Sequence, residues 1–163
     1  DGDIFDALYD APPQSEPLGT VMEGITKLGD AKTIMGLSIL LMAYGNDAHR
    51  ETGRLMSSAF IGTGVVVFSM KQIIHRKRPL DNLVGEPTFP SGHTAFAFTA
   101  ATILSHQYPK LRIPLYIGAG LVGFSRIYLG RHYASDVIAG AAVGTITGTL
   151  VLHYRLTLLK WEF

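Results

Sequence analysis

Long apolar stretches separated by short polar segments dominate the pattern of this chain. No stretch shows the two-residue alternation of a half-buried strand, so the pattern predicts an all-α protein. Five apolar segments are expected to form helices, at residues 33–46, 55–70 with an extension to 74, 91–108, 113–129 and 134–154. Within them Gly, Ala, Ser and Thr stand where a soluble helix carries Lys and Glu on its polar face. The prediction is therefore a bundle of five long apolar helices.

The first 30 residues follow another pattern. Six acidic residues precede Asp30, together with Pro12, Pro13 and Pro17. Apolar residues then follow at helical spacing: Leu18, Val21, Met22, Ile25 and Leu28. This spacing predicts a short amphipathic helix, which we expect to lie on the protein rather than on a bilayer. The chain accordingly divides into an N-terminal surface segment, residues 1–30, and a helical domain, residues 31–158.

Composition indicates where the five helices lie. Apolar residues make up 47% of the 163 residues and charged residues 17%, below the roughly 25% charge of an ordinary soluble domain. A chain of this size cannot bury five all-apolar helices within itself. Gly140, Gly144 and Gly148 also recur at the interval of four that lets membrane helices approach closely. We therefore expect transmembrane helices; several uncharged runs are shorter than about 18 residues, which keeps a soluble bundle as the alternative.

Charge and cysteine content exclude several classes of function. A net charge of +1 gives no indication of a nucleic-acid partner, and the absence of cysteine excludes disulfides, thiolate metal sites and a cysteine nucleophile. The chain begins at Asp1 rather than at Met, which fits the removal of a signal peptide, of a first membrane span or of another N-terminal piece, and the sequence does not decide among them.

An antiparallel order of the helices predicts where the polar segments meet. Residues 71–90 and 125–136 fall at one end, together with the N-terminal segment. Residues 46–54, residues 109–112 and the C-terminus fall at the other end, which carries Arg50, Arg54, Lys110, Arg112, Arg155 and Lys160. The positive-inside bias makes this basic end cytoplasmic and places the first end on the extracytoplasmic face.

The segment from Ser125 to Asp136 holds nearly all the charge of the C-terminal third. If the last helix includes His132, Asp136 lies four residues further along the same face, where its carboxylate can accept a proton from one imidazole nitrogen. The other nitrogen is then free to act as a base or a nucleophile. A polar histidine near a helix start, beside a solvated basic loop, is the alternative for this segment taken alone.

The helix that ends near residue 74 supplies basic residues. Lys71 and Arg78 are seven residues apart, which is two helical turns, so on a helix they point the same way and could grip one anion. A basic cluster that contacts anionic lipid headgroups is the alternative, and Arg76 and Lys77 are expected to do only that.

A further helix start offers an anion site. Ser91 is a natural N-cap residue, and the backbone N–H of Gly92 points out of the helix with the positive end of its dipole. His93 stands where it could protonate a leaving oxygen. With Arg126, the three segments supply three cations, a helix N-terminus and two histidines, but too few acids and no thiols for a metal site. This set fits phosphoryl transfer without a metal.

Three motifs occur in order along the chain: Lys71-x6-Arg78-Pro79, Pro90-Ser91-Gly92-His93 and Ser125-Arg126-x5-His132-x3-Asp136. In this combination the chain resembles the type 2 phosphatidic acid phosphatase superfamily, over roughly residues 18–155. Membrane members of that family usually have six spans, whereas five candidates occur here. The resemblance implies that the sixth would precede Asp1, either removed or replaced by a cleaved signal.

The resemblance implies a role for each candidate residue. His132 is implied to form a phosphohistidine, Asp136 to orient it, and His93 to protonate the leaving oxygen. The implied phosphate-binding residues are Lys71, Arg78 and Arg126, with Ser91 and the Gly92 amide. No metal or other cofactor is implied, and the expected partners are a membrane and a lipid phosphate: phosphatidic acid, phosphatidylglycerol phosphate or a polyprenyl diphosphate.

Three alternatives stay open at this point. A soluble periplasmic or secreted chain would be a broad-specificity acid phosphatase, and a pocket that binds vanadate would be a haloperoxidase. A non-catalytic membrane bundle whose basic end binds anionic lipid is the third, and it would tolerate replacement of His93 and His132. The pattern predicts no oligomeric state.

Overall fold

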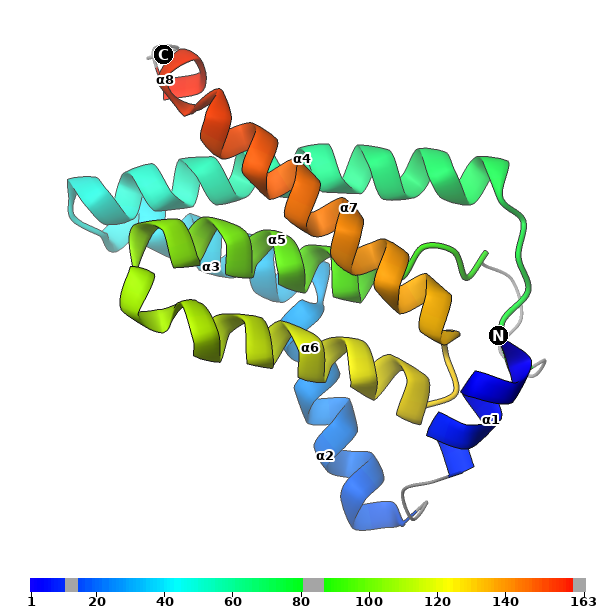
Figure 1. The fold of residues 1–163 in the computed structure, drawn as a ribbon. Helices are drawn as coiled ribbons and strands as arrows, with labels where there is room; N and C mark the ends of the chain where they lie inside the picture. The colour runs from blue at the N-terminus through cyan, green and yellow to red at the C-terminus, as the bar shows by residue number, and fades with distance from the viewer. Residues whose placement is uncertain (11–14, 81–86, 160–163) are drawn as a thin grey trace.

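The structure is a computed structural model that describes residues 1–10, 15–80 and 87–159. Every regular element in these ranges is a helix (Figure 1), which confirms the all-α prediction. The α-helices are α1 (Gly2–Asp10), α2 (Glu16–Thr26), α3 (Ala31–Tyr44), α4 (Asp47–Ile73), α5 (Gly92–Gln107), α6 (Arg112–Tyr128), α7 (Ala134–His153) and α8 (Arg155–Leu159). Short 3-10 helices, η1 (Lys27–Gly29) and η2 (Pro109–Leu111), lie at the joints before α3 and α6.

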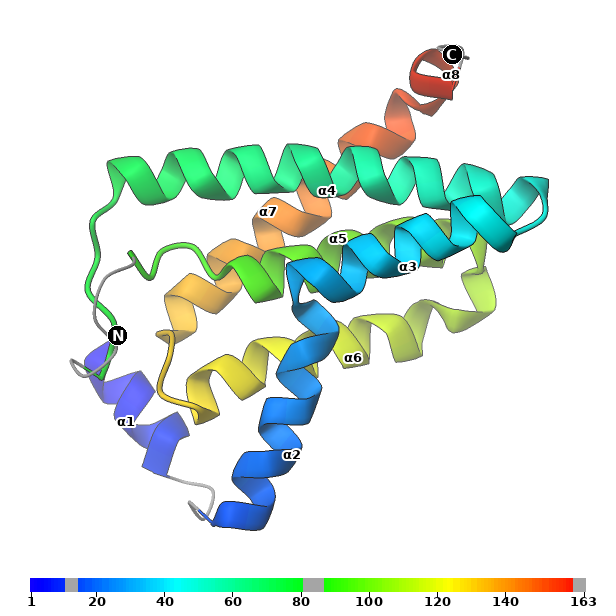
Figure 2. The ribbon, with the colours of Figure 1, turned by 180° about the vertical axis from the view of Figure 1, so that it is seen from behind.

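Helix α5 lies at the centre of the bundle and contacts α3, α4, α6 and α7. Figure 2 shows α3 running alongside α4 and α5 on the side away from α7. Two clusters of buried apolar residues fill the interior, one around Leu55, Met56 and Ile103 and the other around Ala101 and Val122. The five long helices therefore form at the five predicted apolar segments and pack as a single bundle.

The helix α4 starts earlier than predicted, at Asp47 rather than at Leu55. Asn46 is its N-cap, and the Asn46 side chain accepts a hydrogen bond from the backbone N–H of His49 at 3.0 Å. Such a cap satisfies an N–H group that the helix itself leaves unpaired. The predicted turn at residues 46–54 is therefore wrong, because its charged residues form the first turns of α4.

The N-terminal segment contains two helices, of which only α2 was predicted. Helix α2 packs against α6, with Val21 still exposed. Helix α1 is held by Phe5, whose ring lies 5.1 Å from that of Tyr9 and 5.6 Å from that of Tyr133, measured between centroids. Pro12 and Pro13, which figured in the prediction, lie outside the described residues.

Helices α5 and α7 approach each other along the predicted glycine stripe. A Cβ atom would lie 2.5 Å from the carbonyl oxygen of Ser91 if added at Gly140, and 2.1 Å from that of Ala95 if added at Gly144. Added at Gly148, it would lie 2.9 Å from the Cβ of Thr102. These distances leave no space for a side chain, so the glycines set how closely α7 packs on α5.

The ends of the bundle are arranged as predicted (Figure 1). The connections from α4 to α5 and from α6 to α7 lie at one end with the N-terminus, and the other two connections lie at the opposite end with the C-terminus. Of the basic residues predicted for that opposite end, Lys160 lies outside the described residues. The predicted site residues of all three motifs therefore belong to one end of the molecule.

Two helices of the described chain, α4 and α7, are long and apolar enough to cross a membrane. Only 33% of the apolar 18-residue stretch of α4 and 22% of that of α7 is buried within the protein. Ile61, Phe68 and Ile138 are among the exposed residues of these helices. Helices α3, α5 and α6 have 14, 16 and 17 residues, which is below the roughly 18 expected of a span. Of the five helices predicted to be transmembrane, α4 and α7 thus have the length and composition expected of a span.

The glycine stripe generates a test of the packing. Gly144→Ala should lower the free energy of unfolding by about 1–3 kcal/mol, because the added methyl group meets the backbone of Ala95. Gly118→Ala is the matched control, since Gly118 lies in α6 with open space around its Cα. Thermal unfolding in detergent should show a lower Tm for the first variant alone. Equal Tm values would contradict the close approach of α5 and α7.

Candidate active site

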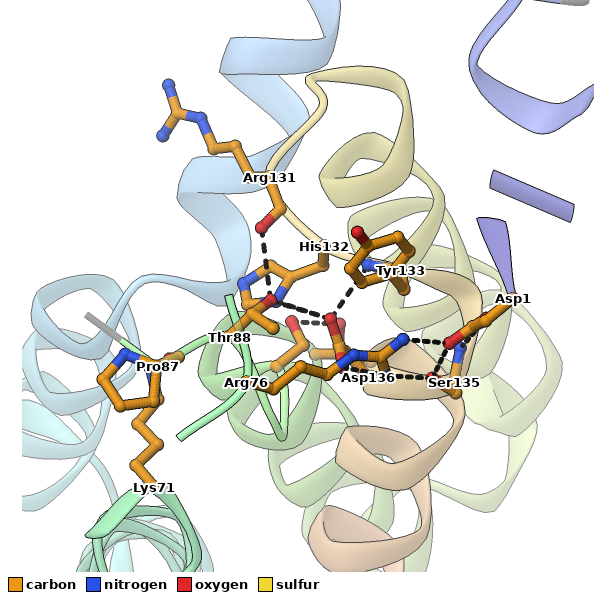
Figure 3. A network of polar contacts seen from close by, with 12 residues as sticks. Asp1, Lys71, Arg76, Pro87, Thr88, Arg131, His132, Tyr133, Ser135 and Asp136 are labelled. Carbon is orange, nitrogen blue, oxygen red and sulfur yellow. Dashed lines mark hydrogen bonds and ion pairs between the residues drawn. The ribbon is translucent and has the colours of Figure 1, made fainter. Parts of the chain in front are cut away.

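Four segments meet at the end of the bundle that holds the candidate residues. They are the C-terminal part of α4 with the chain that follows it, the start of α5, the end of α6 and the start of α7. Figure 3 shows side chains from the chain that follows α4 and from the start of α7 in one hydrogen-bonded network, together with Asp1 and the backbone carbonyl of Arg131. The structure therefore brings the predicted motifs together in space.

The carboxylate of Asp136 lies at the centre of the network and has no exposed surface. Its Oδ2 accepts hydrogen bonds from the backbone N–H of Tyr133 at 2.9 Å and from the hydroxyl of Thr88 at 2.7 Å. Its Oδ1 accepts a bond from the Arg76 guanidinium at 3.1 Å. Asp136 is thus an acceptor for three donors that come from two separate parts of the chain.

His132 precedes α7 instead of lying within it, because α7 begins at Ala134 with Tyr133 as its N-cap. The imidazole is 3% exposed. Its Nδ1 lies 3.6 Å from Oδ2 of Asp136, within ion-pair range but too far for a good hydrogen bond. The hydroxyl of Thr88 lies between the two groups, 2.8 Å from Nδ1. The expected direct bond is therefore replaced by a bridge through Thr88.

The turn before His132 fixes its position. Gly130 has a φ of +64°, the left-handed conformation in which glycine commonly ends a helix. The backbone N–H groups of Arg131 and His132 then donate to the carbonyl of Arg126, at 3.0 and 3.2 Å. The backbone of the histidine is therefore tied to the end of α6.

Burial lowers the pKa of the His132 imidazole to about 4, and the charges of Arg126 and Arg78 act in the same direction. The neighbouring Asp136 carboxylate raises the pKa but does not overcome burial. His132 is accordingly uncharged at neutral pH, which is the form in which a ring nitrogen can act as a nucleophile.

Arg76 has a more specific position than the expected contact with lipid headgroups. Besides Asp136, its guanidinium donates to the Ser135 hydroxyl at 2.6 Å and pairs with the carboxylate of Asp1. It also lies 4.2 Å from the ring centroid of Tyr133, within the range of a cation–π contact. Arg76 therefore belongs to the site, although the sequence analysis did not select it.

The predicted phosphate-binding cations differ in their contacts. Arg126 is 3% exposed and donates from Nη1 to the Thr26 hydroxyl at 3.0 Å, whereas its buried Nε has no hydrogen-bond partner among the described residues. The Lys71 ammonium donates to the carbonyl of Pro87 at 2.7 Å. Arg78 lies beyond the end of α4 at Ile73, so the expected spacing of two helical turns is wrong. The charge of Arg78 nevertheless acts on His132.

The start of α5 lies directly against the start of α7. Ser91 is the N-cap residue of α5, as predicted, but its hydroxyl accepts from the hydroxyl of Thr94 at 2.9 Å and makes no capping bond to the backbone. The backbone N–H of Ser91 donates to the carbonyl of Asp136 at 3.0 Å. Gly92 and His93 open the first turn, where N–H groups lack intrahelical partners. His93 lies within electrostatic range of Arg126 and His132.

Thr88 and Arg76 are the residues bonded through their side chains to the Asp136 carboxylate that were not predicted. Neither occupies a fixed position of the three motifs, and Thr88 is separated from His132 by 44 positions. Among the described residues, no group of three or more His, Cys, Asp or Glu side chains is arranged to hold a metal ion. The described groups are one buried carboxylate, two histidines and several cations.

Comparison with known proteins identifies the family. The family model of the PAP2 superfamily matches residues 52–160. The chain is 34% identical over 151 residues to phosphatidylglycerophosphatase B of Bacillus subtilis, covering 82% of this chain and 73% of that protein. It is also 34% identical over 135 residues to a lipid A 1-phosphatase of Porphyromonas gingivalis. That match covers 77% of this chain and spans only 30% of the relative's length.

Two crystal structures share the fold. One is LpxE of Aquifex aeolicus, with a TM-score of 0.81, 30% identity, and coverage of 93% of this chain and 94% of that chain. The other is a transmembrane PAP2 type phosphatidylglycerolphosphate phosphatase from Bacillus subtilis, with a TM-score of 0.80, 28% identity, and coverage of 99% and 87%. The second likeness supports a membrane location for this chain. The resemblance inferred from the three motifs is thus confirmed: this chain belongs to the PAP2 superfamily and is a phosphatase.

Proposed function

We propose that this protein hydrolyses a lipid phosphate at the membrane through a phosphohistidine intermediate on His132. One observation supports this above the others. The buried, uncharged imidazole of His132 lies close enough to Arg126 for the arginine charge to lower its pKa. The Nε of Arg126 has no hydrogen-bond partner among the described residues. A phosphate oxygen is the acceptor that such a guanidinium suits best.

The class of substrate is inferred from the surface around the site and from the relatives. The bundle exposes apolar side chains on α4, α6 and α7, for example Phe68, Ile117 and Ile138, and such a surface suits lipid. The relatives include a phosphatidylglycerophosphatase, lipid A 1-phosphatases and an undecaprenyl-diphosphatase. The candidate substrates are therefore phosphatidylglycerol phosphate, phosphatidic acid, a lipid A phosphate and a polyprenyl diphosphate.

The proposed reaction has two steps. The charges of Lys71, Arg78 and Arg126 and the amide of Gly92 hold the phosphate, and Nε2 of His132 attacks phosphorus. The bond from phosphorus to the leaving oxygen breaks as His93 gives that oxygen a proton. In the second step His93 takes a proton from water, the water oxygen bonds to phosphorus, and the phosphorus–nitrogen bond breaks to release phosphate.

We further propose that all five long helices cross the bilayer, with the active site on the extracytoplasmic face. Helices α3, α5 and α6 are about 21, 24 and 26 Å long at 1.5 Å per residue. They are shorter than the roughly 30 Å core of a bilayer, so the proposal requires local thinning of the bilayer around them. The orientation rests on the basic residues of the opposite end, because positive charge favours the cytoplasmic side. Arg50, Arg54, Lys110, Arg112 and Arg155 are its described members.

The function is tested by phosphate release from the purified protein in detergent with EDTA. The substrates are phosphatidylglycerol phosphate, a lipid A phosphate and a polyprenyl diphosphate, compared with a small soluble phosphomonoester. Lipid hydrolysis should be lost in His132→Ala, while Asp136→Asn should keep a residual rate. Equal use of the soluble ester would indicate a broad-specificity phosphatase, and a strict need for a divalent metal or full activity in His132→Ala would contradict the mechanism.

The lowered pKa of His132 leads to a test of its charge. The His132 ring should remain uncharged between pH 7 and pH 5, whereas an ordinary imidazole with a pKa of about 6.5 becomes charged in this range. Proton uptake by this group then comes only near pH 4 in the folded protein, so folding stability falls as the pH is lowered from about 6.5 towards 4. Histidine 15N NMR, assigned with His132→Gln, measures this directly. A midpoint near 6.5 would contradict the role of burial.

Arg76 can be tested against its neighbour in the sequence. Arg76→Gln should reduce turnover about tenfold or more, because Asp136 loses a charged donor and bonds of this type contribute about 1.5–3 kcal/mol. Lys77→Gln is the control, because Lys77 is exposed and this substitution removes one positive charge at the neighbouring position. Equal kcat values in the two variants would show that Arg76 acts only through its general positive charge.

A further inference from the structure

We propose that Thr88 is a positioning residue for the nucleophile, in a role that rests on the function proposed for His132. Its hydroxyl carries the hydrogen-bonded link from Asp136 to His132 and holds the imidazole in the tautomer that leaves Nε2 free to attack phosphorus. None of the three motifs includes this residue.

The geometry assigns the direction of each hydrogen bond. A threonine hydroxyl has one proton to donate and lone pairs to accept with. Its Oγ1 lies 2.7 Å from Oδ2 of Asp136 and 3.5 Å from the carbonyl oxygen of Arg131, so the proton goes to the nearer, charged acceptor. The bond of 2.8 Å to Nδ1 of His132 must then be donated by the ring. The imidazole therefore holds its proton on Nδ1, and Nε2 has a free lone pair.

The surroundings keep Thr88 in this position. Its side chain is fully buried, and its backbone N–H donates to the carbonyl of Arg76 at 2.9 Å. Arg76 in turn holds the other oxygen of Asp136 at 3.1 Å. Oδ2 of Asp136 already accepts from Tyr133 and Thr88, so the imidazole cannot take a direct bond at this oxygen without displacing the hydroxyl.

The arrangement has a defined effect on the first chemical step. As the bond from Nε2 to phosphorus forms and the bond to the leaving oxygen breaks, positive charge develops on the ring. The proton stays on Nδ1, and its hydrogen bond to the Thr88 oxygen becomes stronger. Because the Thr88 hydroxyl donates to Asp136, the carboxylate stabilises the charge of the ring through this hydroxyl. The proton for the leaving oxygen comes from His93.

The test compares two variants of the full chain in detergent. Thr88→Val keeps the shape of the side chain and removes the hydroxyl, whereas Thr88→Ser keeps the hydroxyl. Thr88→Val should lower kcat about ten- to hundred-fold with little change in KM, as expected for a lost bond to a charged network. Thr88→Ser should retain kcat within a few-fold. Wild-type kcat in Thr88→Val, or an equal loss in both variants, would overturn the proposal.

A spectroscopic measurement separates this role from a structural one. In 15N NMR of the histidine rings, wild type and Thr88→Ser should show His132 with its proton on Nδ1, and Thr88→Val should lose that preference. A proton on Nε2 in the wild-type protein would overturn the proposal even if Thr88→Val failed to fold. Activity in His132→Ala would instead refute the proposed function, so the two failures are distinguishable.

Discussion

A carboxylate without contact to water is the feature on which the rest of this site depends. Burying the charge of Asp136 is costly unless hydrogen bonds and an opposite charge compensate for it. The compensation comes from Tyr133 at the start of α7 and from Arg76 and Thr88 in the chain that follows α4. The carboxylate therefore holds that chain against α7, and the same chain brings the charge of Arg78 within range of His132.

The second requirement is that α5 and α7 lie unusually close. Without side chains at Gly140 and Gly144 the two backbones can meet, and the backbone N–H of Ser91 can bond to the carbonyl of Asp136. The N-terminus of α5, with its unpaired N–H groups, thereby comes to the segment that carries His132. The same helix contact therefore sets the packing of the apolar interior and the position of the α5 N-terminus beside His132.

Much of this architecture was readable from the sequence, and the exceptions have physical causes. The apolar segments and the antiparallel order gave the helices and the end at which the motifs meet, because both depend on local pattern. The predicted start of α4 was wrong because the Asn46 cap lets the helix begin in a charged segment, which the apolar pattern does not mark as helical. Thr88 and Arg76 were missed because they contact other side chains of the site, through packing between segments far apart in the sequence.

Burial keeps His132 uncharged, and its distance from Asp136 acts in the same direction. At an effective dielectric constant of about 20, an imidazolium interacts with a carboxylate more strongly by about 1 kcal/mol at about 2.8 Å than at about 3.6 Å, which is roughly one pKa unit. A direct bond would thus raise the pKa of His132 and act against the effect of burial. The hydroxyl of Thr88, which lies between the two groups, reduces that attraction in the resting site. It still leaves the carboxylate close enough to stabilise the positive charge that would develop on His132 in the proposed attack on phosphorus.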